Sequence, residues 1–301
     1  MGDGAPPGTQ PDAAPGQPDG AAERLPWDEG FTVEPPVIVP ELNTPSLESE
    51  CFILDERTLL LSSTRPGGTG GFDMYSATRA GRGEPFTAVV ELADLDSPQL
   101  DGRLVTADGL VGYFHSARPG GVGGSDIWRV TRTTTDAPWL AADAVNLAAL
   151  SSSGDDFDPW PSSDDMRIYF IAYDQPDAPG GQDIFVAERS APGEPFGPPV
   201  PLPGINTGAN EDNPALSPDE LFIVFGSDRP GGAGGKDLWF ARRADRDSPF
   251  SPPQPMPEIN SEADDWEVCF DASGEIFYSS NRPGGMGSND IYRSAFVPPA
   301  P

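Results

Sequence analysis

The chain has 301 residues, with 48 acidic and 18 basic side chains and a formal net charge of −30. Such a negative body repels nucleic acid and anionic membrane surfaces, so neither is expected as a partner. The single histidine, His115, argues against a histidine-based metal site or catalytic triad, and we expect no metal and no cofactor. No apolar run of about 18 residues is present, so no transmembrane segment is predicted.

The first part of the chain, residues 1–26, is rich in Pro, Gly, Ala and Asp and has almost no large apolar side chains. It cannot bury enough surface to offset the entropy of ordering, so we predict a disordered tether. It also lacks a basic and an apolar signal region, so the protein is either cytosolic or an exported form whose signal has been removed. We assign residues 27–297 to one folded domain and 298–301 to a C-terminal tail.

A glycine-rich motif recurs five times along the domain. The copies are "SSTRPGGTGGFDMY", "HSARPGGVGGSDIW", "AYDQPDAPGGQDIF", "GSDRPGGAGGKDLW" and "SSNRPGGMGSNDIY". Their aspartates are 53, 57, 54 and 53 residues apart and are Asp73, Asp126, Asp183, Asp237 and Asp290. A near-constant period of this kind is typical of repeat architectures.

Each period contains the strands of one propeller blade. In the fourth copy, "NPALS", "LFIVFGS" and "KDLWFARR" predict three strands, and the proline-rich "SPFSPPQPMPEIN" predicts a ragged outer one. The last copy ends after its third strand, and its missing fourth strand matches residues 35–45, "PPVIVPELNTP". The sequence therefore predicts an all-β, five-bladed β-propeller of four-stranded antiparallel blades, closed by an N-terminal strand that completes the last blade.

The repeated motif itself is interpreted as a structural corner. A phosphate-binding loop needs Lys and Ser or Thr after the glycines, and a calcium loop needs several acidic ligands, neither of which the motif supplies. We expect each aspartate to accept hydrogen bonds from loop N–H groups and each arginine to pair with a nearby carboxylate. These arginines are Arg65, Arg118, Arg229 and Arg282. The third copy has Asp174 instead and a longer loop, which makes it the strongest candidate for a corner used in recognition.

The fourth copy, "LSPDELFIVFGSDRPGGAGGKDLW", resembles the TolB-like, WD-repeat-like β-propeller repeats of bacteria. The resemblance covers residues 27–297 and is specific to the repeat rather than to one function. It implies an exported protein of the periplasm or cell envelope that acts through protein–protein contacts. The composition of the tether suits a lipoprotein or a secreted protein. The propeller of TolB itself has six blades, so its partner is not carried over to this chain.

Acidic residues collect just before the innermost strands, where a propeller has one mouth of its channel. The candidate binding residues there are Glu50, Asp156, Asp158, Trp160, Glu211, Asp212, Asp265, Trp266 and Glu267. Such a rim can attract a cation, a basic peptide or a sugar, but an acidic protein also has acidic solvated loops without function. The two tryptophans suit sugar stacking or equally the filling of the hub.

Two function classes remain open on the sequence. The first is a non-enzymatic, monomeric, exported propeller that binds a protein or a cell-wall component. The second is a carbohydrate-binding or glycoside-hydrolysing propeller, which would show a deep pocket with two converging carboxylates. We expect no catalytic residue, because acids are confined to the approach loops, and we regard His115 as incidental. Cys51 and Cys269 lie on the innermost strands of the first and last blades, where a disulfide would lock the ring in an exported protein.

Overall fold

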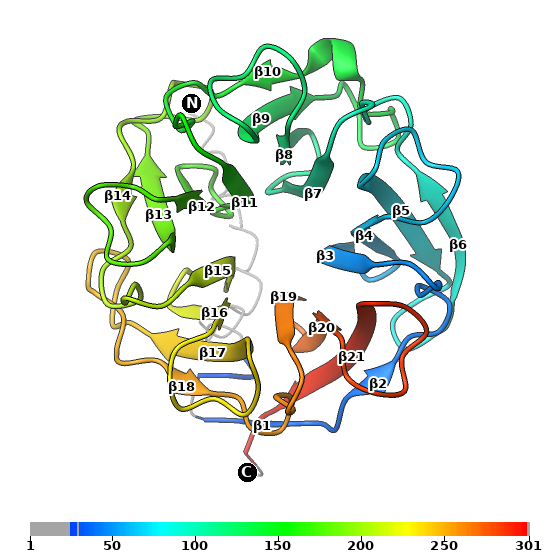
Figure 1. The fold of residues 1–301 in the computed structure, drawn as a ribbon, viewed down its shortest axis with the longest axis vertical. Coiled ribbons are helices and arrows are strands. Elements are labelled where there is room, and N and C mark those ends of the chain that lie inside the picture. Colours follow the sequence, from blue (N-terminus) through cyan, green and yellow to red (C-terminus); the bar gives the residue numbers. More distant parts are fainter. Residues whose placement is uncertain (1–24, 29, 300–301) are drawn as a thin grey trace, which may run out of the picture.

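The computed structural model describes residues 25–28 and 30–299, which form a ring of five antiparallel sheets around a central axis (Figure 1). The predicted five-bladed, all-β propeller is confirmed. The proposed tether falls largely on residues outside the described part, as does the end of the proposed C-terminal tail. No helix among the described residues is long and apolar enough to span a membrane.

Each of the first four blades runs outward from the axis in chain order. Blade 1 consists of β3 (Glu48–Asp55), β4 (Thr58–Ser63), β5 (Asp73–Arg79) and β6 (Phe86–Glu91). Blade 2 consists of β7 (Asp101–Thr106), β8 (Val111–Ser116), β9 (Asp126–Thr131) and β10 (Val145–Asn146), with a short 3₁₀ turn, η1 (Ala141–Asp143), before β10. Blade 3 consists of β11 (Asp156–Pro161), β12 (Arg167–Tyr173), β13 (Gln182–Glu188) and β14 (Val200–Pro201). Blade 4 consists of β15 (Glu211–Leu216), β16 (Phe222–Ser227), β17 (Asp237–Arg242) and β18 (Gln254–Pro255).

Blade 5 takes its outer strands from the start of the chain. It consists of β19 (Asp265–Phe270), β20 (Glu275–Ser280), β21 (Asp290–Val297), β2 (Val37–Ile38) and β1 (Thr32–Val33). β2 pairs antiparallel with β21, with Ile38 opposite Tyr292, so the predicted closing strand is confirmed. β1 adds a second, unpredicted pairing further along β21. Both segments thus hold the first residues of the domain to the last strand.

The ring is also closed by a covalent link on its inner side. Cys51 of β3 and Cys269 of β19 form a disulfide, with their Cα atoms 5.6 Å apart. Both residues are fully buried where the inner strands of blades 1 and 5 meet. This Cα distance is within the range that a disulfide spans, so the bridge expected from the sequence is present.

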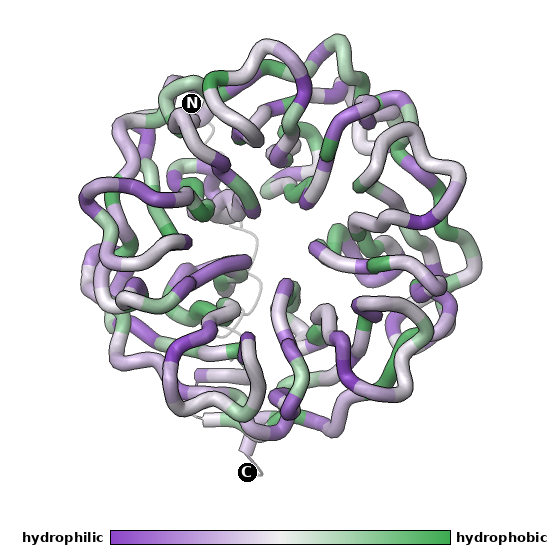
Figure 2. The backbone as a smooth tube through the Cα atoms, in the orientation of Figure 1, coloured by the Kyte–Doolittle hydropathy of each residue, from purple (hydrophilic) through white to green (hydrophobic). Residues whose placement is uncertain are grey.

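The glycine-rich motif forms the corner between the second and third strands of each blade. The motif aspartate, which is the first residue of the third strand in four blades and the second in blade 3, accepts hydrogen bonds from loop N–H groups. Gly70 N, for example, lies 2.6 Å from Asp73 Oδ1, and Val122 N lies 2.8 Å from Asp126 Oδ2. Apolar side chains of the middle strands fill the space between neighbouring blades, whereas hydrophilic segments occur among the strands nearest the axis (Figure 2). The core therefore lies between blades, and the axis stays polar.

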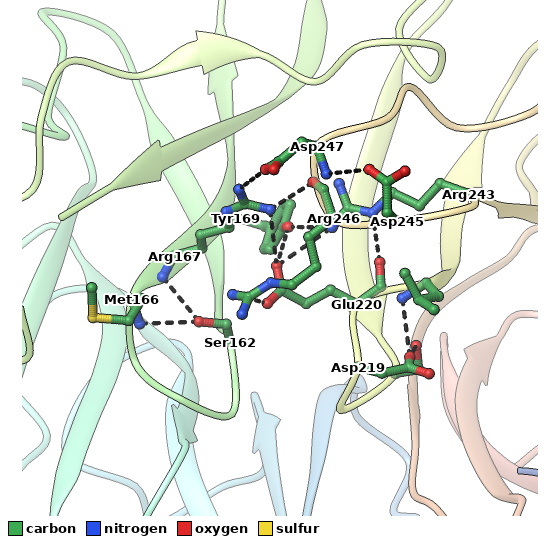
Figure 3. Close-up of polar contacts among 12 residues, drawn as sticks. Ser162, Met166, Arg167, Tyr169, Asp219, Glu220, Arg243, Asp245, Arg246 and Asp247 are labelled. Atoms are coloured by element: carbon green, nitrogen blue, oxygen red, sulfur yellow. Dashed lines mark hydrogen bonds and ion pairs between the residues drawn. The ribbon is translucent and has the colours of Figure 1, made fainter. Parts of the chain in front are cut away.

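Charged side chains join blades 3 and 4 on the side of the ring that carries the turns between first and second strands (Figure 3). Glu220, which is buried, accepts a hydrogen bond of 2.5 Å from the hydroxyl of Tyr169. Its carboxylate also pairs with Arg246, with Arg243 at 3.4 Å and with Arg167 at 3.9 Å. A buried carboxylate is thus surrounded by several positive charges at this blade contact.

Candidate functional site

The innermost strand of every blade contains a β-bulge with a polar residue in the left-handed conformation. These residues and their φ angles are Glu50 (53°), Arg103 (42°), Asp158 (55°), Asn213 (48°) and Glu267 (52°). In each strand the pairing register shifts across this residue, for example between Ser49 and Phe52 and between Trp266 and Cys269. A non-glycine residue in the left-handed conformation costs on the order of 1 kcal/mol or more, and a bulge changes the direction of its side chain. Because all five blades have the same bulge, these five residues form a ring of polar side chains around the axis.

The acidic residues therefore lie on the inner strands and not in the approach loops, so the sequence-based placement was wrong. The first residue of each inner strand has a carboxylate that contacts the loop before the strand. Asp156, Glu211 and Asp265 belong to this set. Glu211, for example, accepts hydrogen bonds from Thr207 N at 2.7 Å and pairs with Arg229. Two of the nine candidate binding residues, Glu211 and Asp265, are thus structural, because each pairs with the arginine of its corner. Asp156 accepts the equivalent backbone N–H, from Ser152, but has no arginine partner among the described residues.

The two candidate tryptophans differ in position. Trp160 is buried, with its ring edge-on to Phe52 and the guanidinium of Arg103 5.5 Å from its ring centroid, so it fills the hub. Trp266 lines a pocket, and the ammonium group of Lys236 lies 4.7 Å from the centroid of its ring. The expected cation–π contact thus exists within the protein, and it covers one face of the Trp266 ring.

The other four candidates, Glu50, Asp158, Asp212 and Glu267, line one pocket of about 400 Å³ at the axis together with Trp266. Its polar lining consists of Glu50, His115, Asp158, Asp212, Asn213, Lys236 and Glu267. Its aromatic lining consists of Phe72, Phe157, Tyr173 and Trp266. The pocket thus draws side chains from all five blades, and it has the converging carboxylates that distinguish the second function class.

His115 is a central member of this site, which corrects the expectation that it is incidental. Its Nδ1 accepts a hydrogen bond from the backbone N–H of Asp158 at 3.3 Å, so the neutral ring carries its proton on Nε2. Nε2 lies 3.5 Å from Glu50 Oε1. Burial, reinforced by the charge of Arg103, lowers the pKa of His115 to about 3, so the ring is neutral at ordinary pH.

Hydrogen bonds fix the ring of bulge residues from within. Asn213 Nδ2 donates to Asp158 Oδ2 at 2.8 Å, and the Glu50 N–H donates to Glu267 Oε2 at 3.2 Å. Arg103 Nη2 donates to the carbonyl oxygens of two neighbouring inner strands at 3.2 and 3.3 Å, and Arg103 Nη1 lies 3.9 Å from Asp158 Oδ1. The side chains are held in place before any ligand arrives, which is the condition for a pre-organised site.

The electrostatics of the pocket keep several carboxyls protonated. Burial raises the pKa of Glu267 to about 8, helped by the charges of Asp158 and Asp212. Burial also raises the pKa of Asp158 to about 6, against the effect of Arg103, and raises that of Glu50 well above its usual value. Lys236 is also buried, but its ion pair with Asp212 outweighs that effect and raises the pKa of the ammonium. Near neutral pH, Glu267 is therefore a hydrogen-bond donor and Asp158 an acceptor.

Four buried polar atoms of the pocket have no hydrogen-bond partner among the described residues. They are Glu50 Oε2, Asp158 Oδ1, Asp212 Oδ1 and the indole nitrogen Trp266 Nε1. Ligand atoms of Glu50, His115 and Asp158 also lie within 4.8 Å of one another, so these three residues could hold a metal ion. Unpaired buried acceptors and donors are costly, and a ligand with groups of both kinds would satisfy them.

Sequence reasoning missed Arg103, His115, Asn213 and Lys236. One signal was available for two of them: a polar residue stands two positions after the first carboxylate of every inner strand, and Arg103 and Asn213 occupy that position. No such signal marks His115, which lies on the second strand of blade 2, or Lys236, which lies in the corner loop directly before β17. Both reach the pocket only through the closed ring.

No protein-family model matches the chain, and no curated protein matches it. Among solved structures, it is similar to an α-L-arabinofuranosidase from Lactobacillus brevis, with a TM-score of 0.55, 13% identity and coverage of 86% of this chain and 92% of that one. An α-L-arabinofuranosidase from Podospora anserina, in complex with cellotriose, has a TM-score of 0.53, 12% identity and coverage of 89% and 97%. A putative TolB from Agrobacterium tumefaciens has a TM-score of 0.49, 14% identity and coverage of 90% and 100%. At these identities the likeness shows a propeller fold alone.

Proposed function

We propose that the protein is a carbohydrate-binding propeller that holds one or two sugar units of a glycan in the axial pocket. The observation that carries this proposal is the set of unsatisfied polar atoms, because it contains three carboxyl oxygens and one N–H donor. Sugar hydroxyls both donate and accept hydrogen bonds, so one ligand serves both kinds of atom. A bare cation would satisfy the oxygens and leave Trp266 Nε1 without a partner.

Size and shape agree with a sugar ligand. A pocket of about 400 Å³ lies at the low end of small-molecule sites, and the rings of Phe157 and Tyr173 offer apolar faces for the C–H side of a sugar ring. The protonated Glu267 and the ionised Asp158 provide a donor and an acceptor on the same wall. The similarity to arabinofuranosidases is compatible with this ligand class but is not its basis.

We propose binding without hydrolysis. Glycosidases need two carboxyls about 5 to 10 Å apart, with the bond to be cleaved between them. Here Glu50 and Asp158 have oxygens within 4.8 Å of each other with His115 between them, and both carboxyls are buried. Asp212 is committed to Lys236. These contacts leave little room for a glycosidic bond and a water molecule between an acid and a base.

Saturation-transfer NMR with L-arabinose, D-glucose and cellotriose tests the proposal on the full chain. We expect saturable binding of at least one sugar, and at least about tenfold weaker binding by Glu50→Gln and Trp266→Phe. Glu188→Gln, which changes an exposed carboxylate outside the pocket, is the matched control and should bind as the parent does.

Two outcomes would overturn this function. Binding of calcium ions that Glu50→Gln abolishes, with no binding of any sugar, would make the pocket a cation site. Release of nitrophenol from an aryl α-L-arabinofuranoside by the parent but not by Glu50→Gln would make the protein a hydrolase.

We further propose that the protein works outside the cytoplasm, as a TolB-like repeat propeller of the cell envelope. The disulfide supports this location, because such bonds persist in oxidising compartments. The five "RPGG"-type corners support the repeat family. Isolation of the native protein with the Cys51–Cys269 bridge intact tests the location; two free thiols in the native protein would contradict it.

A further inference from the structure

In four of the five blades, an arginine of the corner motif occupies a socket beside the inner strand. Its Nε donates to a serine hydroxyl at 2.8–3.0 Å, and its Nη2 donates to a main-chain carbonyl at 2.6–2.9 Å. The same Nη2 lies 2.5–3.5 Å from the carboxylate that begins the inner strand. The aromatic ring of the third strand lies 4.7–5.6 Å from the guanidinium carbon.

Blade 3 has the socket without the arginine. Asp174 stands where the arginine would be, and Ala172 stands where the serine would be, opposite Asp156 in the strand pairing. The remaining groups are all present: the inner-strand carboxylate of Asp156, the backbone of Leu150, and the ring of Phe185. Together they line a cavity of about 260 Å³.

Two aromatic rings of this cavity are arranged like the two rings that contact the corner arginine of blade 5. In blade 5, Arg282 lies against Tyr278 and Tyr292, whose ring centroids are 5.9 Å apart with an interplanar angle of 27°. In blade 3, the equivalent rings of Phe170 and Phe185 are 6.2 Å apart with an interplanar angle of 31°. The aromatic platform for a guanidinium is therefore preserved in the blade that lacks one.

Asp156 has an unused oxygen in the cavity. Its side chain is fully buried, and its Oδ2 accepts the Ser152 N–H at 2.6 Å, as the equivalent oxygen of Asp265 accepts Ser261 N at 2.6 Å. The other oxygen of Asp265 pairs with Arg282 at 2.5 Å, whereas Asp156 Oδ1 has no partner among the described residues. Burial raises the pKa of Asp156 to about 6, as expected for a carboxylate without its cation.

We propose that the blade 3 cavity binds the guanidinium group of an arginine side chain from a partner protein. The bound group would donate to Asp156 Oδ1 and to the carbonyl of Leu150 and lie against the rings of Phe170 and Phe185, repeating the contacts of the internal arginines. Guanidinium fits this set better than ammonium, because it is planar and donates in several directions at once. Exposed Asp177 at the lining of the cavity adds negative charge, and the net charge of −30 favours a basic partner.

Titration of the full chain with Nα-acetyl-arginine amide and Nα-acetyl-lysine amide, followed by the amide NMR signals of Leu150 and Ile184, tests this proposal. We expect saturable shifts with the arginine probe and at least about tenfold weaker binding of the lysine probe. Binding should strengthen as the pH rises from 5 to 7, because Asp156 must be ionised. Loss of selectivity over lysine, or absence of saturation, would overturn the proposal.

Variants separate recognition from stability. Asp156→Asn keeps the acceptor for Ser152 N–H and should abolish binding of the arginine probe while the protein stays folded. Glu258→Gln makes the same charge change at an exposed site on the loop of blade 4 and should leave binding unchanged. Unaltered binding by Asp156→Asn would contradict the site.

A second pair of probes identifies the source of the guanidinium. The peptide Ala-Arg-Ala should bind at least as tightly as free L-arginine if the site takes a side chain of a partner protein. Much tighter binding of free arginine would instead identify a small metabolite as the ligand and overturn the partner-protein assignment.

Discussion

Two buried glutamates with left-handed backbones, Glu220 and Glu267, have opposite surroundings. Glu220 lies at the contact of blades 3 and 4, with three arginines and a tyrosine hydroxyl around its carboxylate (Figure 3). Glu267 lies at the axis among other carboxyls, and Lys236, the cation that lowers its pKa, is already paired with Asp212. The fold can compensate a buried carboxylate, so its failure to do so at the axis supports a role for those carboxyls in binding.

The largest effect is expected from Glu220→Gln. Loss of the negative charge leaves Arg243, Arg246 and Arg167 without their shared partner, and breaking a buried ion pair from one side costs about 3 to 5 kcal/mol. Urea unfolding with the disulfide intact measures the free energy of unfolding. Glu188→Gln removes an exposed partner of Arg167 and should cost less than about 1 kcal/mol. Equal losses of unfolding free energy in the two variants would show that the buried ion pairs of Glu220 stabilise the protein no more than the exposed pair of Glu188.

An intermediate effect, visible in the pH dependence, is expected from Glu267→Gln. The folded protein keeps a proton on Glu267 up to about pH 8, whereas the unfolded chain releases it near its usual pKa of 4.5. Unfolding between these values releases a proton, so stability is greatest below that range and falls as the pH rises. His115 opposes this trend only below about pH 6.5, where the unfolded chain is protonated and the buried ring is not.

The window free of the His115 contribution is therefore about pH 6.5 to 8. Asp96, whose pKa is also raised to about 8, contributes there in both proteins, so the effect of Glu267 is the difference between parent and variant. Between pH 6.5 and 8, the titration of Glu267 should lower the free energy of unfolding of the parent by about 1 to 2 kcal/mol. The free energy of unfolding of Glu267→Gln should fall by that much less over the same range. Urea unfolding at several pH values measures both slopes. Identical slopes in parent and variant would mean that the Glu267 carboxyl is ionised in the folded protein.

The smallest effect is expected from Asp96→Asn, at a buried carboxyl remote from both regions. Its counterparts Asn43, Asn206 and Asn260 each accept one backbone N–H and donate to the carbonyl of the same residue, as Asn206 does with Ile184. Asp96 only accepts, from Met74 N at 3.2 Å, and burial raises its pKa to about 8.

Asparagine at position 96 should restore the missing donor and raise stability by about 1 kcal/mol where the carboxyl is protonated in both states. The gain should grow as the pH rises from about 4 towards 8, where only the unfolded chain is ionised, and level off above pH 8. Thermal unfolding of parent and variant at pH 6 and pH 9 checks this. A destabilised variant at both values would show that the Asp96 carboxyl has a partner that asparagine cannot replace.

The sequence carried enough information for the fold because the period of the corners is local and repeated. "RPGG" followed by an aspartate marks four of the corners, and "APGG" followed by an aspartate marks the third. The match of residues 35–45 to later outer strands located the closure. The axial site was harder, because His115, Asp158 and Glu50 come from three blades and meet only when the ring closes. The bulges that aim Arg103 and Asn213 inward have no glycine or other backbone marker in the sequence.

The third corner shows the same limit in another form. The exchange of arginine for Asp174 was visible in the sequence, but its consequence was not. Only the contacts of Arg118 and Arg282 reveal that Asp156 and Phe185 are the remains of a complete guanidinium socket. A substitution becomes interpretable when the groups that it leaves behind are known.

The disulfide between Cys51 and Cys269 also decides how the molecule carries a mechanical load. It joins residues 218 positions apart, so it encloses most of the chain in one covalent loop. A force applied between the two ends of the chain passes through the bridge and extends only the segments outside it. At about 3.3–3.6 Å per extended residue, roughly 700 Å of chain is shielded while the bond is oxidised. Once the disulfide is reduced, the same force can also extend this part of the chain as the blades unfold.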